Sequence, residues 1–74
     1  MHMTVGAEAT LFVLSEEDPL TMRGDHTLPS YSVLEEARIG LQVRRQNRPS
    51  CALRIWRLTF KPTSSRMEAH AEAF

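Results

Sequence analysis

The sequence predicts a small α+β domain in which one main helix packs on one face of an antiparallel sheet of about three strands, in the order strand, strand, helix, strand. Three observations support this fold class: a period-two apolar pattern near the start, a central amphipathic segment with helix signals, and a run of β-forming residues after it. The 74 residues are treated as one domain, residues 1–74. Because so short a chain buries only about 60% of its unfolded surface, self-association as a homodimer is expected.

The first predicted strand covers residues 4–14. Apolar residues alternate along one of its faces, namely Val5, Ala7, Ala9, Leu11 and Val13. Phe12 and Leu14 add apolar side chains to the other face, so we expect this strand to be covered on one side and partly on the other. Residues 16–19 form a turn signal that ends in a proline. Residues 20–23 are then predicted to return as a second strand, which would complete a hairpin.

The central helix is predicted from Ser32 to about Asn47. Ser32 and Glu35 have the spacing of a capping box, in which the hydroxyl and the carboxylate satisfy free backbone amides. Pro49 ends the helix because the residue before a proline disfavours the helical conformation. The apolar stripe expected to pack on the sheet consists of Val33, Leu34, Ala37 and Leu41.

Two features of this helix fall outside that stripe. Gly40 lies in its middle, where glycine costs about 0.8–1 kcal/mol relative to alanine, so we expect a close backbone approach there. Ile39 and Val43 lie one turn apart on roughly the opposite side of the helix. We predict that this pair contacts a second copy or another protein.

The last predicted strand covers residues 51–61. Leu53 and Ile55 alternate on one face and Trp56, Leu58 and Phe60 on the other. Two explanations of this phase change stay open, a β-bulge between Ile55 and Trp56 or burial of both faces. One sheet face or edge would then stay uncovered, and we expect a homodimer or partner to cover Trp56, Phe60 or Phe12 there.

The two ends of the chain are interpreted separately. Residues 1–3 are interpreted as a vector-derived or disordered start. Residues 62–74 are expected to form a linker followed by a flexible tail or a short helix. Ser65 and Glu68 would cap that helix, which would run from Met67 to Phe74.

Charge is distributed unevenly along the chain. Residues 1–34 contain five acidic and one basic side chain, whereas residues 35–74 contain four acidic and eight basic ones. Between Arg38 and Arg66 there is no acidic residue, which is typical of a surface for an anionic partner. The candidate anion or nucleic-acid contacts are Arg44, Arg45, Arg48, Arg54, Arg57 and Lys61. Arg54 and Arg57 should lie on opposite faces of their strand, and solvated or internally paired arginines are the alternative explanation.

The sequence gives little sign of catalysis. His26 and Cys51 are the residue types of a nucleophile and its base, and a small enzyme using them is one hypothesis. We nevertheless expect no catalytic residue, no metal ligand, no cofactor and no small-molecule substrate, because no Cys/His pair has metal-ligand spacing. The single cysteine, Cys51, excludes an internal disulfide. No membrane segment or export signal is found, so we expect a cytoplasmic protein.

The segment Tyr31-Ser-Val-Leu-Glu-Glu-Ala-Arg, a helix that ends Arg-Arg-Gln-Asn-Arg-Pro, and the strand Ala-Leu-Arg-Ile-Trp-Arg-Leu together resemble small proteins encoded by bacteriophages and mobile elements of proteobacteria. The resemblance covers roughly residues 30–60. It implies a strand or hairpin, a capped helix and a final strand. Some small phage proteins of this size, such as anti-CRISPR proteins, act by binding and blocking a host protein.

The favoured functional hypothesis is therefore a non-catalytic, protein-binding accessory protein of phage or mobile-element type that occludes the surface of its partner. Its predicted contact residues are Ile39, Val43, Trp56 and Phe60. The first alternative is a small nucleic-acid-binding module that uses the basic segment Arg38–Arg66. The second alternative is the small enzyme that uses His26 and Cys51.

Overall fold

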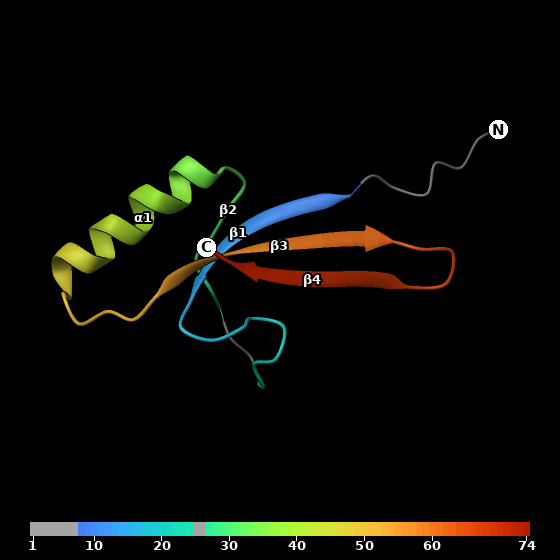
Figure 1. Cartoon of the computed structure of the whole chain (residues 1–74), viewed down its shortest axis with the longest axis horizontal. Coiled ribbons are helices and arrows are strands. Elements are labelled where there is room, and N and C mark those ends of the chain that lie inside the picture. The colour runs from blue at the N-terminus through green and yellow to red at the C-terminus, as the bar shows by residue number, and fades with distance from the viewer. Residues whose placement is uncertain (1–7, 25–26) are drawn as a thin grey trace.

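A computed structural model describes residues 8–24 and 27–74 of the chain as a four-stranded antiparallel sheet with one α-helix (Figure 1). In chain order the elements are β1 (Ala9–Ser15), β2 (Ser30–Tyr31), α1 (Leu34–Asn47), β3 (Arg54–Pro62) and β4 (Met67–Ala73). The strands lie in the order β2-β1-β3-β4 across the sheet. The predicted α+β class is confirmed, with one strand more than expected. The part of the first predicted strand before Glu8 and the start at residues 1–3 lie outside the described residues.

The core forms where α1 packs against one face of one end of the sheet. Its buried members are Leu14, Ala37, Leu41 and Ile55. Half-buried apolar side chains packed around them are Phe12, Tyr31, Leu34 and Leu53. The helix contacts β1, β2 and β3, and within the described chain it makes no contact with β4. Consequently the hairpin of β3 and β4, together with the start of β1, projects beyond the helix (Figure 1).

This projection makes the molecule elongated. Its dimensions are 52 × 26 × 19 Å and its radius of gyration is 14.5 Å. A compact domain of this length would have a radius of gyration of about 11 Å. The difference reflects the half of the sheet that α1 leaves uncovered.

The helix begins later than predicted. Its N-cap residue is Val33, whose backbone is extended and whose side chain makes no capping hydrogen bond. Tyr31 pairs with Phe12 of β1, which keeps the chain extended through Val33 and places Ser32 one residue too early to cap. The capping-box prediction is therefore wrong, and Val33, exposed at 49%, does not belong to the packing stripe. The helix ends at Asn47, as predicted from Pro49.

Gly40 makes the close approach that the sequence suggested, but the approaching group is a side chain. A Cβ atom at this position would lie 2.7 Å from Cζ of Tyr31. Arg44 fixes the same ring by donating from Nη1 to the Tyr31 hydroxyl at 3.2 Å and to the Gly40 carbonyl at 3.1 Å. The missing side chain thus lets β2 and α1 come into contact.

The predicted strand at residues 20–23 is wrong. Those residues follow a turn in which the Asp18 carboxylate accepts from the Leu20 amide at 2.9 Å and the Asp18 carbonyl accepts from the Thr21 amide at 3.1 Å. The loop then folds back so that the Met22 sulfur lies 3.4 Å from the Ser15 hydroxyl. The partner of β1 on this side is instead the two-residue strand β2.

Residues 67–73 form the edge strand β4, so the predicted C-terminal helix and its Ser65–Glu68 cap are wrong. The reversal is made by a tight turn in which the Arg66 carbonyl accepts hydrogen bonds from the Thr63 amide and hydroxyl, both at 2.7 Å. All seven β4 residues pair with β3. Met, Glu and Ala favour helices, but pairing along the whole of β4 outweighs that preference.

The pairing of β1 with β3 excludes the β-bulge. Seven consecutive residue pairs run without a gap from Ala9–Phe60 to Ser15–Arg54. Ile55 is buried under the helix, while Leu58 is buried on the opposite face, each less than one-tenth exposed. Of the two explanations left open by the sequence, burial of both faces holds for Ile55 and Leu58, whereas Trp56 and Phe60, on the face of Leu58, are half-buried.

Candidate interaction surface

The strand register divides the sheet into two faces of different chemistry. Successive side chains along a strand point to opposite faces of the sheet, and the side chains of two paired residues point to the same face. Leu14 and Ile55 form one pair and belong to the core with Ala37 and Leu41, so their face is the one that α1 covers. Val13 pairs with Trp56, and Leu11 with Leu58, on the face opposite the helix. Phe12 lies on the helix side, paired with Tyr31 and Arg57, so its expected place on the uncovered face is corrected.

The helix-free face of the projecting half is almost entirely apolar. We call its side chains the open face: Leu11, Leu58, Phe60, Met67, Ala69 and Ala71. Leu58 is buried by its neighbours, Phe60 is half-buried, and Leu11 and Met67 are exposed at 37% and 59%. A contiguous apolar area of this kind on a small protein is typical of an interaction surface.

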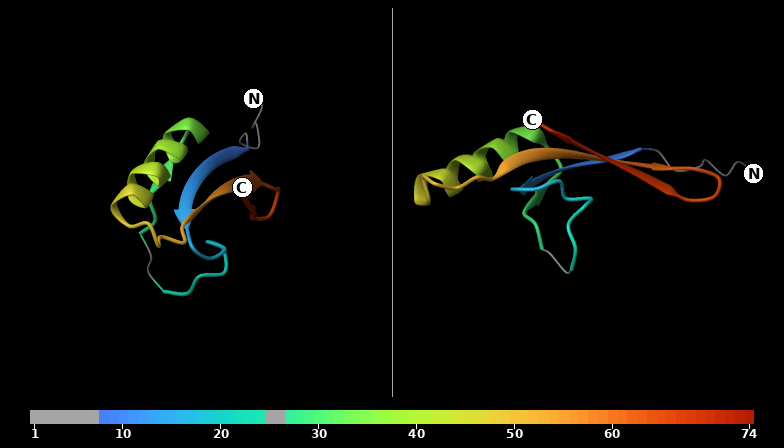
Figure 2. Two further views of the ribbon diagram at one scale, coloured as in Figure 1. Left: turned by 60° about the vertical axis from the view of Figure 1, so that its left-hand side comes forward. Right: turned by 60° about the horizontal axis from the view of Figure 1, so that its bottom comes forward.

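The loop at residues 16–24 covers the other end of this face. It lies on the side of the sheet away from α1 and stays near the helix end, short of the β3–β4 turn (Figure 2). Val13, which is only 4% exposed, lies at this covered end. Trp56 marks the boundary: it is half-buried, and its Nε1 donates to the Ser15 carbonyl at 3.1 Å. The predicted contact residues Trp56 and Phe60 therefore both lie on the helix-free face.

The opposite face of the same projecting strands is polar. It carries Thr10, Thr59, Lys61, Glu68 and His70. Exposing these polar side chains to water is not unfavourable, whereas exposing the apolar side chains of the open face to water costs free energy. The projecting half of the sheet is thus apolar on one face and polar on the other.

The second predicted contact pair lies on α1. Ile39 is exposed at 59% and Val43 at 49%. Ala37 and Leu41, which face the sheet, are buried, so the pair points away from it. The two apolar surfaces, Ile39–Val43 and the open face, are separate.

The basic residues do not gather at one place. Arg38, Arg57 and Arg66 form ion pairs with Glu35, Glu72 and Glu68, respectively. Arg44 and Arg45 donate to neutral oxygens, including the Leu53 carbonyl at 3.2 Å from Arg45. Among the described residues, the basic side chains left without such a partner are Arg48, Arg54 and Lys61. Arg54 and Lys61 lie at opposite ends of β3, about 23 Å apart along the strand.

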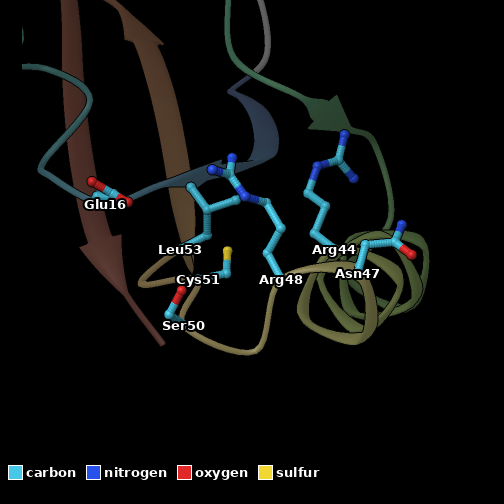
Figure 3. A pocket seen from close by; sticks show the side chains of 7 residues that line it. All are labelled: Glu16, Arg44, Asn47, Arg48, Ser50, Cys51 and Leu53. Atoms are coloured by element: carbon cyan, nitrogen blue, oxygen red, sulfur yellow. The ribbon is translucent and has the colours of Figure 1, made fainter.

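A hollow of about 580 Å³ lies between the end of α1 and the start of β3. Its lining residues are Glu16, Arg44, Asn47, Arg48, Ser50, Cys51 and Leu53 (Figure 3). The Cys51 side chain is half-buried in it and forms no disulfide. Figure 3 shows the Arg44 and Arg48 side chains rising from the helix end in the same direction. Two arginines, Arg44 and Arg48, and the thiol of Cys51 line the hollow, and no histidine is among its lining residues.

Other functional groups are sparse in the described part of the chain. His26, the proposed base for Cys51, lies outside it. Over residues 8–24 and 27–74, no cluster of histidine, cysteine or carboxylate side chains has the geometry to hold a metal ion. The described helix is too short and too polar to cross a membrane.

Comparisons with known proteins add no assignment: no protein-family model matches the sequence, and neither the curated proteins nor the solved structures gave a match.

Sequence reasoning missed part of the open face. Leu11 is predicted to lie in a strand but not in a contact surface, and Met67, Ala69 and Ala71 fall in the segment predicted to be a flexible tail or a short helix. The signal that identifies them is the strict alternation of residues 67–73, in which Met and Ala occupy odd positions and Glu and His even ones.

Proposed function

We propose that this chain is a cytoplasmic, non-catalytic protein-binding protein of a phage or mobile element, and that it acts by occupying a surface of its partner with the open face. The observation that carries the proposal is the uncovered apolar side of the projecting β3–β4 hairpin. The projecting strands carry a contact surface well away from the core under α1. Such an arrangement suits a protein whose projecting β-hairpin inserts into an apolar groove of a larger partner protein.

The partner is expected to present an apolar, concave surface with a polar rim. The centre of the open face has no charged side chain, and burial of uncharged apolar area dominates the centre of protein interfaces. At its margin, Arg66 lies in the turn between β3 and β4 and can contact the rim. The likeness of residues 30–60 to phage and mobile-element proteins supports a host protein as that partner.

The nucleic-acid alternative has weaker support. Nucleic-acid binding requires cations that converge on the phosphate backbone. Five of the eight basic residues between Arg38 and Arg66 already bond to groups within the chain. The remaining three are spread along the length of the molecule.

Two matched substitutions on β1 test the proposal. Leu11→Lys places a charge on the open face, whereas Thr10→Lys places the same charge one residue away on the polar face. In a proteobacterial lysate, tagged wild-type protein and the Thr10→Lys variant should retain the same host protein, which is then identified and purified. Leu11→Lys should weaken the measured affinity for that protein at least tenfold, and Thr10→Lys by less than about threefold.

Equal effects of the two lysines on affinity, with both variants folded, would refute the open face as the docking surface. Val43→Asp examines the second predicted contact pair in the same assay. We expect this exposed substitution to leave the fold intact, and weaker binding would place this pair in the interface in addition to the open face. An unchanged affinity would remove Ile39 and Val43 from the interface.

A further inference from the structure

The outer edge of β4 offers a row of unpaired backbone groups. The Phe74 amide donates to the Ile55 carbonyl at 2.9 Å, and the Thr63 amide donates to the Arg66 carbonyl at 2.7 Å. Hydrogen-bonded pairs alternate along an antiparallel ladder, so these two bonds fix the pattern for the whole strand. The even-numbered residues of β4 bond to β3, and the N–H and C=O groups of Met67, Ala69, Ala71 and Ala73 point outward.

This edge lacks several of the usual protections against pairing. Natural edge strands carry charged side chains, especially lysine, or proline or a bulge, or are covered by another element. Of these, β4 has two glutamates but no lysine, no proline and no bulge. The sequence of β4 is MEAHAEA, its pairing with β3 is continuous, and no described element lies beyond it. We propose that β4 pairs antiparallel with β4 of a second copy of this chain, around a two-fold axis at Ala69, to give a continuous eight-stranded sheet.

Charge complementarity selects the axis at Ala69. In this register Glu68 lies opposite His70 of the second copy, and Arg66 lies opposite Glu72 of the second copy. An axis at His70 would instead oppose Glu68 to Glu72 of the second copy and His70 to itself. Like charges that lie directly opposite each other destabilise a sheet. Both axes align outward-pointing residues with each other, so the charges decide between these two.

The apolar side of the strand favours the same axis. Met67, exposed at 59%, would lie opposite Ala71 of the second copy, so that a long side chain covers a short one. The pair at the axis itself is Ala69 with its own copy, where two small side chains let the backbones approach closely. An axis at Ala71 would instead place the charged Glu68 opposite the apolar Phe74 of the second copy. Dimerisation through the edge also joins the two open faces into one wider apolar surface. The pairing uses backbone groups of β4, so this inference does not depend on which partner the open face binds.

Cysteine cross-linking tests both the pairing and its register. In a Cys51→Ser background, Ala69→Cys places two thiols at the axis, where paired Cα atoms lie about 5.5 Å apart, within the range of a disulfide. The matched variant Ala71→Cys places its thiol about 13 Å along the strand from its copy. Under mild oxidation we expect Ala69→Cys to form covalent dimer at least tenfold faster than Ala71→Cys. Equal rates, or faster cross-linking at residue 71, would overturn the inference.

A backbone variant provides the second test. Ala69→Pro removes an outward-pointing N–H that β3 does not use, and proline is tolerated at such edge positions. By sedimentation, the wild-type chain should have twice the 8.4 kDa mass of the monomer, and folded Ala69→Pro should have the monomer mass. A monomeric wild-type chain at millimolar concentration, or a dimeric Ala69→Pro variant, would overturn the proposal. If this variant does not fold, the cysteine comparison still decides.

Discussion

Position 40 requires glycine because the Tyr31 ring lies against it, and not because of its backbone conformation. Its φ is not positive; among the glycines at residues 8–24 and 27–74, that conformation occurs at Gly24. A helix of this composition would therefore gain from alanine at position 40, except for Tyr31. The aromatic ring, fixed by Arg44, contributes to the core where β2 meets α1.

A double-mutant cycle separates these two effects. We expect Gly40→Ala to lower the free energy of unfolding by about 1 kcal/mol or more, because overpacking against the ring costs about 1–3 kcal/mol and exceeds the gain in helix propensity. In a Tyr31→Ala background, the same substitution should raise that free energy by up to about 1 kcal/mol. Urea denaturation measures both values. The same sign of effect in the two backgrounds would show that Tyr31 does not constrain position 40.

At the scale of whole elements, the position of a segment in the sheet determined its structure more than its composition did. The central helix and the strand after it were predictable, since Ala37, Leu41 and Ile55 carry clear periodic signals. The Ser65–Glu68 capping signal predicts a short helix or a flexible tail over residues 67–74, although the strict alternation of residues 67–73 indicates a strand. The two-residue strand β2 has no signal of its own, because it exists only by pairing with β1.

The start of the helix gives a second prediction. Ser32 was expected to cap α1, and loss of a serine cap typically costs about 1 kcal/mol. Because the structure places the N-cap at Val33 with no side-chain capping bond, Ser32→Ala should change the free energy of unfolding by less than about 0.5 kcal/mol. Denaturant melts of the two proteins measure the difference. A loss of 1 kcal/mol or more would restore the capping box and contradict the extended conformation at Val33.

At the scale of the whole molecule, the shape is explained by the offset between α1, about 21 Å long, and the β3–β4 hairpin, whose strand β3 is about 30 Å long and extends beyond the helix. The helix covers one end of the sheet and the loop at residues 16–24 covers part of the other face. The sequence predicted an uncovered sheet face near Trp56 and Phe60. The sequence alone did not show that Leu11 and Met67 lie on that face, or that the arginines lie far apart. Both facts depend on the register of β1, β3 and β4.

The central claim is that the projecting sheet, and not the basic segment, mediates association. Light scattering coupled to size exclusion tests it most directly, at low and high salt, with and without a mixed-sequence DNA fragment. The account predicts a dimer of twice 8.4 kDa whose mass is insensitive to salt and which does not comigrate with DNA. Backbone pairing and apolar contacts are screened little by ions, whereas phosphate contacts weaken steeply with salt. A monomer that comigrates with DNA at low salt and releases it at high salt would contradict the account.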